Sequence, residues 1–230
     1  MNTMRSLRVR FGFLESLLYL TLVSAGFFVA GAISNHSFEF WYLIWNLFLA
    51  WVPVLVALWL LVLLKHHAWS SWRCLGLSLA WIAFLPNSFY MVSDFLHIQD
   101  YQRVDVVYDT VMFSSFILTG LLLGYTSLYI MHRELLRRIK PQTAWVFIGT
   151  IVLVCSFAIY LGRDLRWNTW DVLTNPTGIL FDISELVIHP STHYLAFTTT
   201  LTFFIFLISL YMVAWQLMRN LRVVRPLPKQ

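Results

Sequence analysis

Six long apolar runs, separated by short polar segments, constrain the fold of this chain more than any other feature. A helix needs about 20 consecutive apolar residues to cross a hydrocarbon core that is roughly 30 Å thick. Backbone polar groups in lipid must be satisfied within the segment, so such runs are helices. The sequence therefore predicts an all-α, polytopic membrane protein that forms a single integral membrane domain over residues 1–230. Its six transmembrane helices are expected near residues 11–33, 41–64, 74–92, 109–131, 143–162 and 193–217.

The composition agrees with these runs and excludes a soluble domain. Of the 230 residues, 59% are hydrophobic and 12% are charged, whereas about 45–50% and about 25% are usual in soluble domains. The net charge of +5 does not indicate nucleic-acid binding, because the basic residues are divided among short segments and form no single patch. Membrane lipids are therefore the expected partners, and nucleic acid is not.

The basic residues distinguish the two sides of the membrane. With the six spans in place, 13 of the 16 lysines and arginines fall on one face, and the other face holds Arg103, Arg163 and Arg166. Because Lys and Arg are retained on the cytoplasmic side, both termini are predicted to be cytoplasmic. Most acidic residues lie on the opposite, extracytoplasmic face, which the rule for basic residues does not explain.

Individual residues within the spans refine this prediction. The first apolar run has about 23 residues, beyond the roughly 7–15 of a signal-peptide core, so we expect a retained helix. Cys74 and Cys155 lie at different depths, so they are not expected to form a disulfide. In the second span, Asn46 and Pro53 predict an internal polar contact and a kink.

The connection between spans five and six, residues 163–192, is longer than the other loops. Its segment NPTGILFDISELVI begins with Asn175 and Pro176, which favour a helix start. Apolar residues then recur at helical spacing, with polar ones opposite. The apolar positions are Ile179, Leu180, Ile183, Leu186 and Val187, and the polar ones are Asp182, Ser184 and Glu185. The segment is too short to span, so we expect an extracytoplasmic interfacial helix that caps the bundle.

Polar residues gather at the outer end of span three, in FLPNSFYMVSDFLHIQD. Pro86 should kink or end the span and free backbone carbonyls, which Asn87 or water would satisfy. Asp94 and His97 follow at a spacing of three, so a continuing helix would place them on one face.

Two further stretches should reach the same face of the membrane. VYDTVMF places Asp109 at the outer start of span four, and YLGRDLRWNTWD follows span five with Arg163, Arg166, Asn168 and Asp171. The ends of spans three, four and five are therefore predicted to bring carboxylates, an imidazole and two guanidiniums together.

This cluster has two interpretations. Unpaired charges near hydrocarbon are costly, so the two arginines could pair with the aspartates in a purely structural bidentate network. Alternatively, Asp94, His97 and Asp109 form a divalent-metal site, and Arg163 and Arg166 hold an anionic headgroup or phosphate. His97, oriented by an aspartate, could also act as a general base.

The residues fall into three candidate groups. One Asp-x-x-His pattern is less specific than a His-Glu-x-x-His zinc pattern, so the metal is the weaker part of the hypothesis. The candidate catalytic residues are Asp94, His97, Asp109 and Asp171, the candidate metal ligands are Asp94, His97 and Asp109, and the candidate substrate-binding residues are Asn87, Arg163, Arg166 and Asn168.

The stretches FLPNSFYMVSDFLHI, VYDTVMFSSFILTGLLLGYTSLYIM and IYLGRDLRWNTWDVLTNP resemble DUF1361, a family of bacterial multi-pass membrane proteins without a characterised activity. The resemblance covers spans three to six and implies a location in the bacterial inner membrane. Family members tend to have Asn-Ala-Pro-Tyr where this chain has Asn87-Ser88-Phe89-Tyr90, which suggests a less rigid exit from span three. The candidate site residues fall on motif positions of the family.

Three classes of function follow. The leading hypothesis is a lipid- or envelope-linked hydrolase or transferase, in which an activated water attacks, because no nucleophilic Ser or Cys motif is present. A small-solute transporter or channel would need ionisable or broken-helix sites near the middle of the bilayer, where the spans are mostly apolar. A membrane scaffold or assembly factor would leave the outer cluster entirely paired. The sequence does not indicate an oligomeric state.

Overall fold

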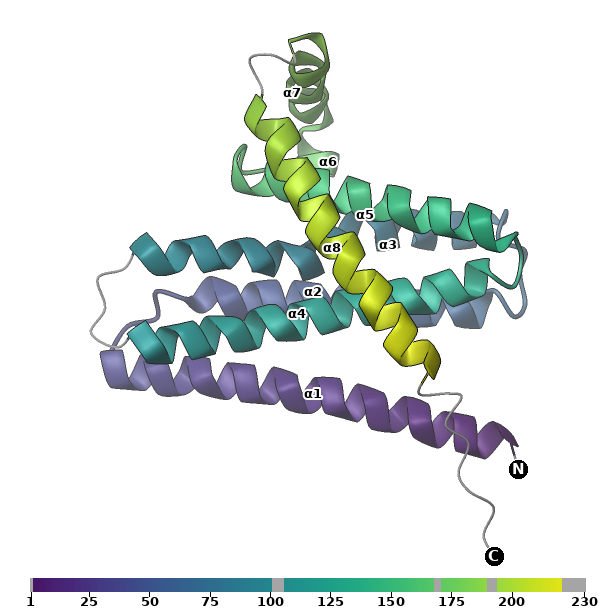
Figure 1. Ribbon diagram of the computed structural model, residues 1–230, viewed down its shortest axis with the longest axis horizontal. Helices are drawn as coiled ribbons and strands as arrows, with labels where there is room; N and C mark the ends of the chain where they lie inside the picture. Colours follow the sequence, from purple (N-terminus) through teal and green to yellow (C-terminus); the bar gives the residue numbers. More distant parts are fainter. Residues whose placement is uncertain (1, 101–105, 168–170, 190–193, 221–230) are drawn as a thin grey trace, which may run out of the picture. The chain divides into compact units, whose positions relative to one another are not determined.

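The computed structural model describes the backbone of residues 2–100, 106–167, 171–189 and 194–220 (Figure 1). Side chains are described within these ranges except at 2–13, 96–100, 172–173, 187 and 220. The described residues form helices and no strand. The elements in chain order are α1 (Asn2–Asn35), α2 (Trp41–Leu63), α3 (Trp72–Tyr90), the 3₁₀-helix η1 (Met91–Asp100), α4 (Val106–Leu135), α5 (Pro141–Arg163), α6 (Asp171–Thr174), α7 (Pro176–Ile188) and α8 (Tyr194–Asn220).

The described helices confirm the all-α, six-span prediction. Each predicted apolar run overlaps a helical stretch that is long and apolar enough to cross a membrane. These stretches are Leu14–Asn35, Trp41–Leu63, Trp72–Phe95, Val106–Leu135, Pro141–Arg163 and Tyr194–Arg219. The protein is therefore a multi-pass membrane protein, and the thirteen-residue α7 lies between the last two spans, as predicted.

The chain forms two compact units, Met1–Ser127 and Leu128–Gln230, which divide within α4. Each unit is described by itself below. That the two units act as one integral membrane domain stays a prediction.

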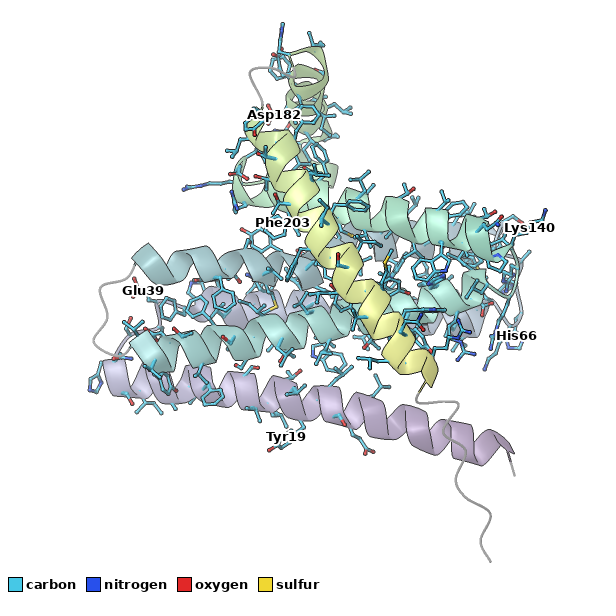
Figure 2. All side chains as sticks on the ribbon, in the orientation of Figure 1. Tyr19, Glu39, His66, Lys140, Asp182 and Phe203 are labelled. Atoms are coloured by element: carbon cyan, nitrogen blue, oxygen red, sulfur yellow. The ribbon has the colours of Figure 1, made fainter. Side chains whose placement is uncertain are left out.

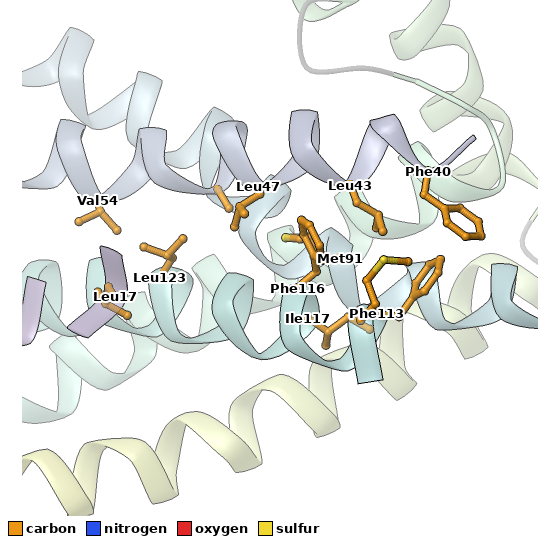
Figure 3. Packing of buried hydrophobic residues seen from close by; sticks show 12 residues of the cluster. Leu17, Phe40, Leu43, Leu47, Val54, Met91, Phe113, Phe116, Ile117 and Leu123 are labelled. Carbon is orange, nitrogen blue, oxygen red and sulfur yellow. The ribbon is translucent and has the colours of Figure 1, made fainter. Parts of the chain in front are cut away.

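The core of the first unit is an apolar cluster shared by α1, α2, η1 and the first part of α4 (Figure 3). Phe113 and Phe116 of α4 are fully buried, and Phe113 meets Phe40 edge to face, with ring centroids 5.0 Å apart. Met91, the first residue of η1, is also fully buried in this cluster. Packing therefore fixes the start of η1, the segment that contains Asp94.

Helices α3 and α4 approach closely at two glycines of α4, Gly120 and Gly124, which form a GxxxG pattern. A Cβ atom at Gly120 would lie 2.8 Å from the carbonyl oxygen of Ser88. A Cβ at Gly124 would lie 2.7 Å from the ring of Phe89. Small residues at such spacing let helices in membranes pack backbone to backbone.

Buried serines satisfy carbonyls of α2 around Pro53. Proline lacks an N–H group, so it removes a helical hydrogen bond and loosens the carbonyls one turn earlier. The Ser88 hydroxyl donates to the Ala50 carbonyl over 3.1 Å. The Ser127 hydroxyl donates to the Pro53 carbonyl over 3.1 Å, and it accepts from the Trp81 indole at 2.6 Å. Polar side chains of α3 and α4 thus bind the backbone of α2 on both sides of Pro53.

In the second unit, α7 packs on the ends of α5 and α8, which confirms the predicted cap for this pair of spans. Leu186 of α7 is buried against Tyr160 of α5 and Ala196 of α8. The helix begins where the sequence indicated: Pro176 is in its first turn, and Asn175 Oδ1 accepts from the Gly178 N–H at 3.1 Å. The side chain of Val187, assigned to the same apolar face, lies outside the described part of the chain.

Candidate functional site

The centre of the predicted site is Asp94, which is buried in the first unit with 2% of its surface exposed. The Asn46 amide of α2 donates to Asp94 Oδ2 over 3.3 Å. This confirms that Asn46 makes an internal polar contact. Among the described residues, Asn46 is the hydrogen-bond partner found for the Asp94 carboxylate. The sequence had suggested arginines as partners of this carboxylate, and an approach of Arg163 or Arg166 to it stays a prediction.

Pro86 was expected to kink or end span three, and the structure excludes the second alternative. This proline lies inside α3 and does not end it, because the α-helix continues to Tyr90. Neighbouring helices can satisfy the carbonyls that a proline frees in a membrane, so interior prolines are tolerated there. The Asn87 amide donates to the Phe84 carbonyl over 3.1 Å.

The change from α-helix to 3₁₀-helix at Met91 decides how Asp94 and His97 are arranged. A 3₁₀-helix has about three residues per turn, so positions three apart lie on the same face. The backbone of η1 therefore places positions 94 and 97 one above the other. The His97 side chain lies outside the described residues, and its part in the site stays a prediction.

Asp109 is buried, with 6% of its surface exposed, in the first turn of α4. Backbone N–H groups at a helix N-terminus favour a negative charge. The preceding residue fixes this turn against α1, because the Tyr108 hydroxyl donates to the Phe27 carbonyl at 2.6 Å. The negative charge of Asp109 therefore suits the start of α4.

The described side chains contain no group of three or more His, Cys, Asp or Glu residues that could hold a metal ion. Since the His97 side chain was not among them, the predicted site of Asp94, His97 and Asp109 is not tested by this finding. Two carboxylates and an imidazole remain a suitable ligand set for a divalent metal.

The remaining candidate residues belong to the second unit, so their meeting with Asp94 stays a prediction. Arg163 is half-buried and donates to its neighbour Asp164 over 3.2 Å. Arg166 is exposed, with a left-handed backbone at φ 59°. Asp171 opens α6 and accepts from the Thr174 hydroxyl at 3.3 Å. Asn168 lies outside the described residues.

A second polar group, which the sequence did not indicate, surrounds His132 near the end of α4. His132 is fully buried. Its Nδ1 is 2.9 Å from the Tyr211 hydroxyl of α8. The imidazole stacks on Trp215, with centroids 4.2 Å apart, and meets Trp145 of α5 edge to face at 4.6 Å. Nothing in the described part of the chain hydrogen-bonds to its Nε2.

The His132 cluster was missed because span four was predicted to end near residue 131, just before His132. The sequence MHRELLRRIK then looks like a cytoplasmic charge cluster. The helix in fact continues to Leu135. A useful signal was present, since Trp145, Tyr211 and Trp215 stand near the same membrane boundary in spans five and six.

Residues 45–208 match the model of a family described as "Protein of unknown function (DUF1361)". The chain belongs to the DUF1361 family. The match includes both Asp94 with its partner Asn46 and the buried His132, whereas α1 lies before it. No curated protein and no solved structure matches the chain. The DUF1361 description names no activity, so a function has to be argued from the residues themselves.

Proposed function

We propose that this protein resides in the bacterial inner membrane and acts on a lipid- or envelope-linked substrate with an anionic group. The site is centred on Asp94 at the extracytoplasmic face. The reaction is a hydrolysis or group transfer in which an activated water attacks. Both termini are cytoplasmic in this proposal.

The observation that carries the proposal is the burial of Asp94 beside a neutral partner. A buried carboxylate is costly when no cation compensates it. An asparagine or threonine could make the same contact to Asn46 without that cost. Ionisable residues kept in such surroundings are candidates for proton transfer or ligand binding. Among the candidate residues, Asp94 is therefore the one whose burial is explained least well by a purely structural role.

The other groups of the cluster have complementary roles in this proposal. His97, one 3₁₀ turn after Asp94, and Asp109 complete either a divalent-metal site or an acid–base pair. A bound metal would lower the pKa of its water and so supply the nucleophile. Arg163 and Arg166 hold the anionic group of the substrate, with Asn87 and Asn168 as further binding residues, and Asp171 is an additional acid or base.

The charge distribution of the first unit supports the proposed orientation. Figure 2 shows Glu39 and His66 at opposite ends of this unit. Glu39 precedes α2, at the end expected to be outside, and His66 follows α2 next to Lys65. Alkaline phosphatase fused after residue 38 should be active, and fused after residue 67 inactive. The reverse pattern would overturn the orientation.

The chemical proposal is tested with purified protein in detergent, supplied with Zn²⁺, Mn²⁺ or Mg²⁺. Metal content is then measured after removal of free ions. We expect stoichiometric metal in the unchanged protein and its loss in His97→Ala and Asp94→Asn. Matched controls, His66→Ala and Asp182→Asn, should retain it. Unchanged metal in His97→Ala, or no metal in any form, would exclude a metal site that includes His97.

Turnover is measured on vesicles of phosphatidylglycerol and phosphatidic acid, as release of water-soluble headgroup or inorganic phosphate. Release that depends on Asp94 but persists with a chelator would indicate metal-free acid–base catalysis.

The second candidate is a non-enzymatic scaffold. It would be favoured if no lipid phosphate were released and no lipid stayed bound to the purified protein. That candidate is supported by the ion pair of Arg163 with Asp164, which occupies one of the two arginines. Ion flux in proteoliposomes would instead indicate a transporter.

A further inference from the structure

Helix α7 has a second apolar face that the predicted pattern did not contain. The spacing in the sequence predicted its apolar residues on one side. In the structure, Leu180, Phe181 and Ile188 are exposed, with 65%, 64% and 64% of their surfaces accessible. At about 100° per residue, these three positions fall within roughly 100° of one another. They form one outward surface, called here the outer face of α7.

The outer face of α7 carries no charge. Thr177 and Ser184 also lie on this face, and both hydroxyls are bonded locally. Ser184 donates to the Phe181 carbonyl at 2.6 Å, and Thr177 donates to Asn175 Oδ1 at 3.3 Å. Neither hydroxyl therefore needs water. An outward helix face in water is ordinarily polar, so this composition indicates a different environment.

The opposite side of α7 is held against the protein. Leu186 packs on Tyr160 and Ala196. Asp182 accepts from the Trp167 indole at 2.8 Å, so the loop after α5 is tied to the helix as well. Both contacts lie away from the outer face, and they fix which side of α7 is turned outward.

These contacts also give the depth of α7 relative to the spans. Tyr160 lies three residues before the end of α5, at Arg163, and Ala196 lies two residues after the start of α8, at Tyr194. With a rise of about 1.5 Å per residue, both are within roughly 5 Å of the ends of their spans. Leu186 of α7 is thus near the ends of both spans, where hydrocarbon is expected to meet water. The exposed Tyr194 beside it suits that level, where aromatic residues gather.

We propose that the outer face of α7 is a lipid-binding surface, with Leu180, Phe181 and Ile188 inserted among the acyl chains of one leaflet. Glu185 lies beside this face at the water edge. The surface is continuous with the exposed Tyr194 and Leu195 at the start of α8, which as part of a span contact lipid. The occupant is a membrane leaflet of low net negative charge, because α7 contains Asp182 and Glu185 and no basic residue. This inference does not depend on any chemistry at Asp94.

The test is spin labelling of the whole protein in lipid nanodiscs. Both native cysteines, Cys74 and Cys155, are fully buried and are replaced by alanine. Single cysteines at positions 180, 181 and 188 then carry the label. Position 201 of α8 serves as a lipid-facing control, and position 66 of the α2–α3 loop as a water-facing control. Collision with oxygen, which partitions into lipid, is compared with collision with a water-soluble nickel chelate.

We expect the ratio of oxygen to nickel collisions at 180, 181 and 188 to be several-fold above that at 66 and close to that at 201. Position 185 should fall between the two controls. A ratio at 181 equal to that at 66 would overturn the proposal. Dipolar broadening between labels at 181 would also overturn it, because it would show a second copy on the same face. Three label positions and size-exclusion profiles exclude an effect of one misfolded variant.

Discussion

The close approach of α3 to α4 gives the sharpest prediction about stability, through Gly120→Ala. The new Cβ would lie 2.6 Å from Met91 Sδ and 2.8 Å from the Ser88 carbonyl oxygen. Ordinary van der Waals contact begins at 3.4 Å. The methionine end can turn aside, but the carbonyl belongs to the backbone. The helices must therefore separate by 3.4 − 2.8, about 0.6 Å, at this point.

The cost follows from overpacking. Extra methyl groups in a packed core cost about 1–3 kcal/mol. Alanine gains up to about 1 kcal/mol over glycine in a helix interior. We therefore expect Gly120→Ala to lower the free energy of unfolding by about 1–2 kcal/mol. For a chain of this size that corresponds to a fall of about 2–8 °C in Tm.

The assay is thermal denaturation in detergent, followed by the loss of the monodisperse size-exclusion peak. The matched controls are Gly76→Ala in α3 and Gly26→Ala in α1, where a Cβ would meet nothing within 4 Å. They should leave Tm unchanged or raise it. If Gly120→Ala behaved like Gly76→Ala, the proposed backbone contact at Gly120 would be wrong.

Three further predictions concern the polar groups. Asn46→Leu should lower the free energy of unfolding by about 1–3 kcal/mol, because it leaves a buried carboxylate without its donor; Asp94→Asn in the same chain should recover part of this loss in Tm, and equal loss in both would refute the pairing. Tyr211→Phe should lower the free energy of unfolding by a similar amount, because it removes the partner of His132 Nδ1. Adding His132→Phe to that variant should lower the free energy of unfolding little further. Asn175→Ala should lower the local stability of α7 by about 1 kcal/mol, because it removes the N-terminal cap of the helix. Limited proteolysis should then show faster cleavage next to α7, whereas the Tm of global unfolding should stay unchanged.

The spans were predictable because length and hydropathy are local properties of the sequence. The six apolar runs, the start of α7 at Asn175 and the internal contact of Asn46 all depend on residues near one another or on a single residue type. The continuation of α3 past Pro86 agrees with the span predicted at residues 74–92, whereas the change to a 3₁₀-helix at Met91 was not predicted, because it depends on how Met91 packs in the core. The sequence contains the GxxxG pattern at Gly120, but it does not indicate which helix packs against these glycines.

Of the candidate site, the sequence indicated Asp94 as a polar residue that needs a partner. It did not indicate Asn46 as that partner, because the contact depends on how α2 and η1 pack. The outward face of α7 shows the same limit. A single apolar stripe predicted one buried side, whereas the burial of Leu186 and the exposure of Phe181 need two environments.

Packing at Gly120 also determines where Asp94 lies. The carbonyl of Ser88 and the side chain of Met91 meet α4 at Gly120, and they bracket the residues where α3 becomes the 3₁₀-helix η1. Asp94 follows Met91 by three residues, one turn of that helix. A separation of α3 and α4 at this glycine would therefore move the start of η1 away from α2 and lengthen the contact of Asp94 with Asn46, now 3.3 Å. Gly120→Ala should for that reason weaken the effect of Asn46→Leu on Tm, although Gly120 touches neither residue of the pair. Additive effects of the two substitutions would show that the glycine contact and the Asp94 site are independent.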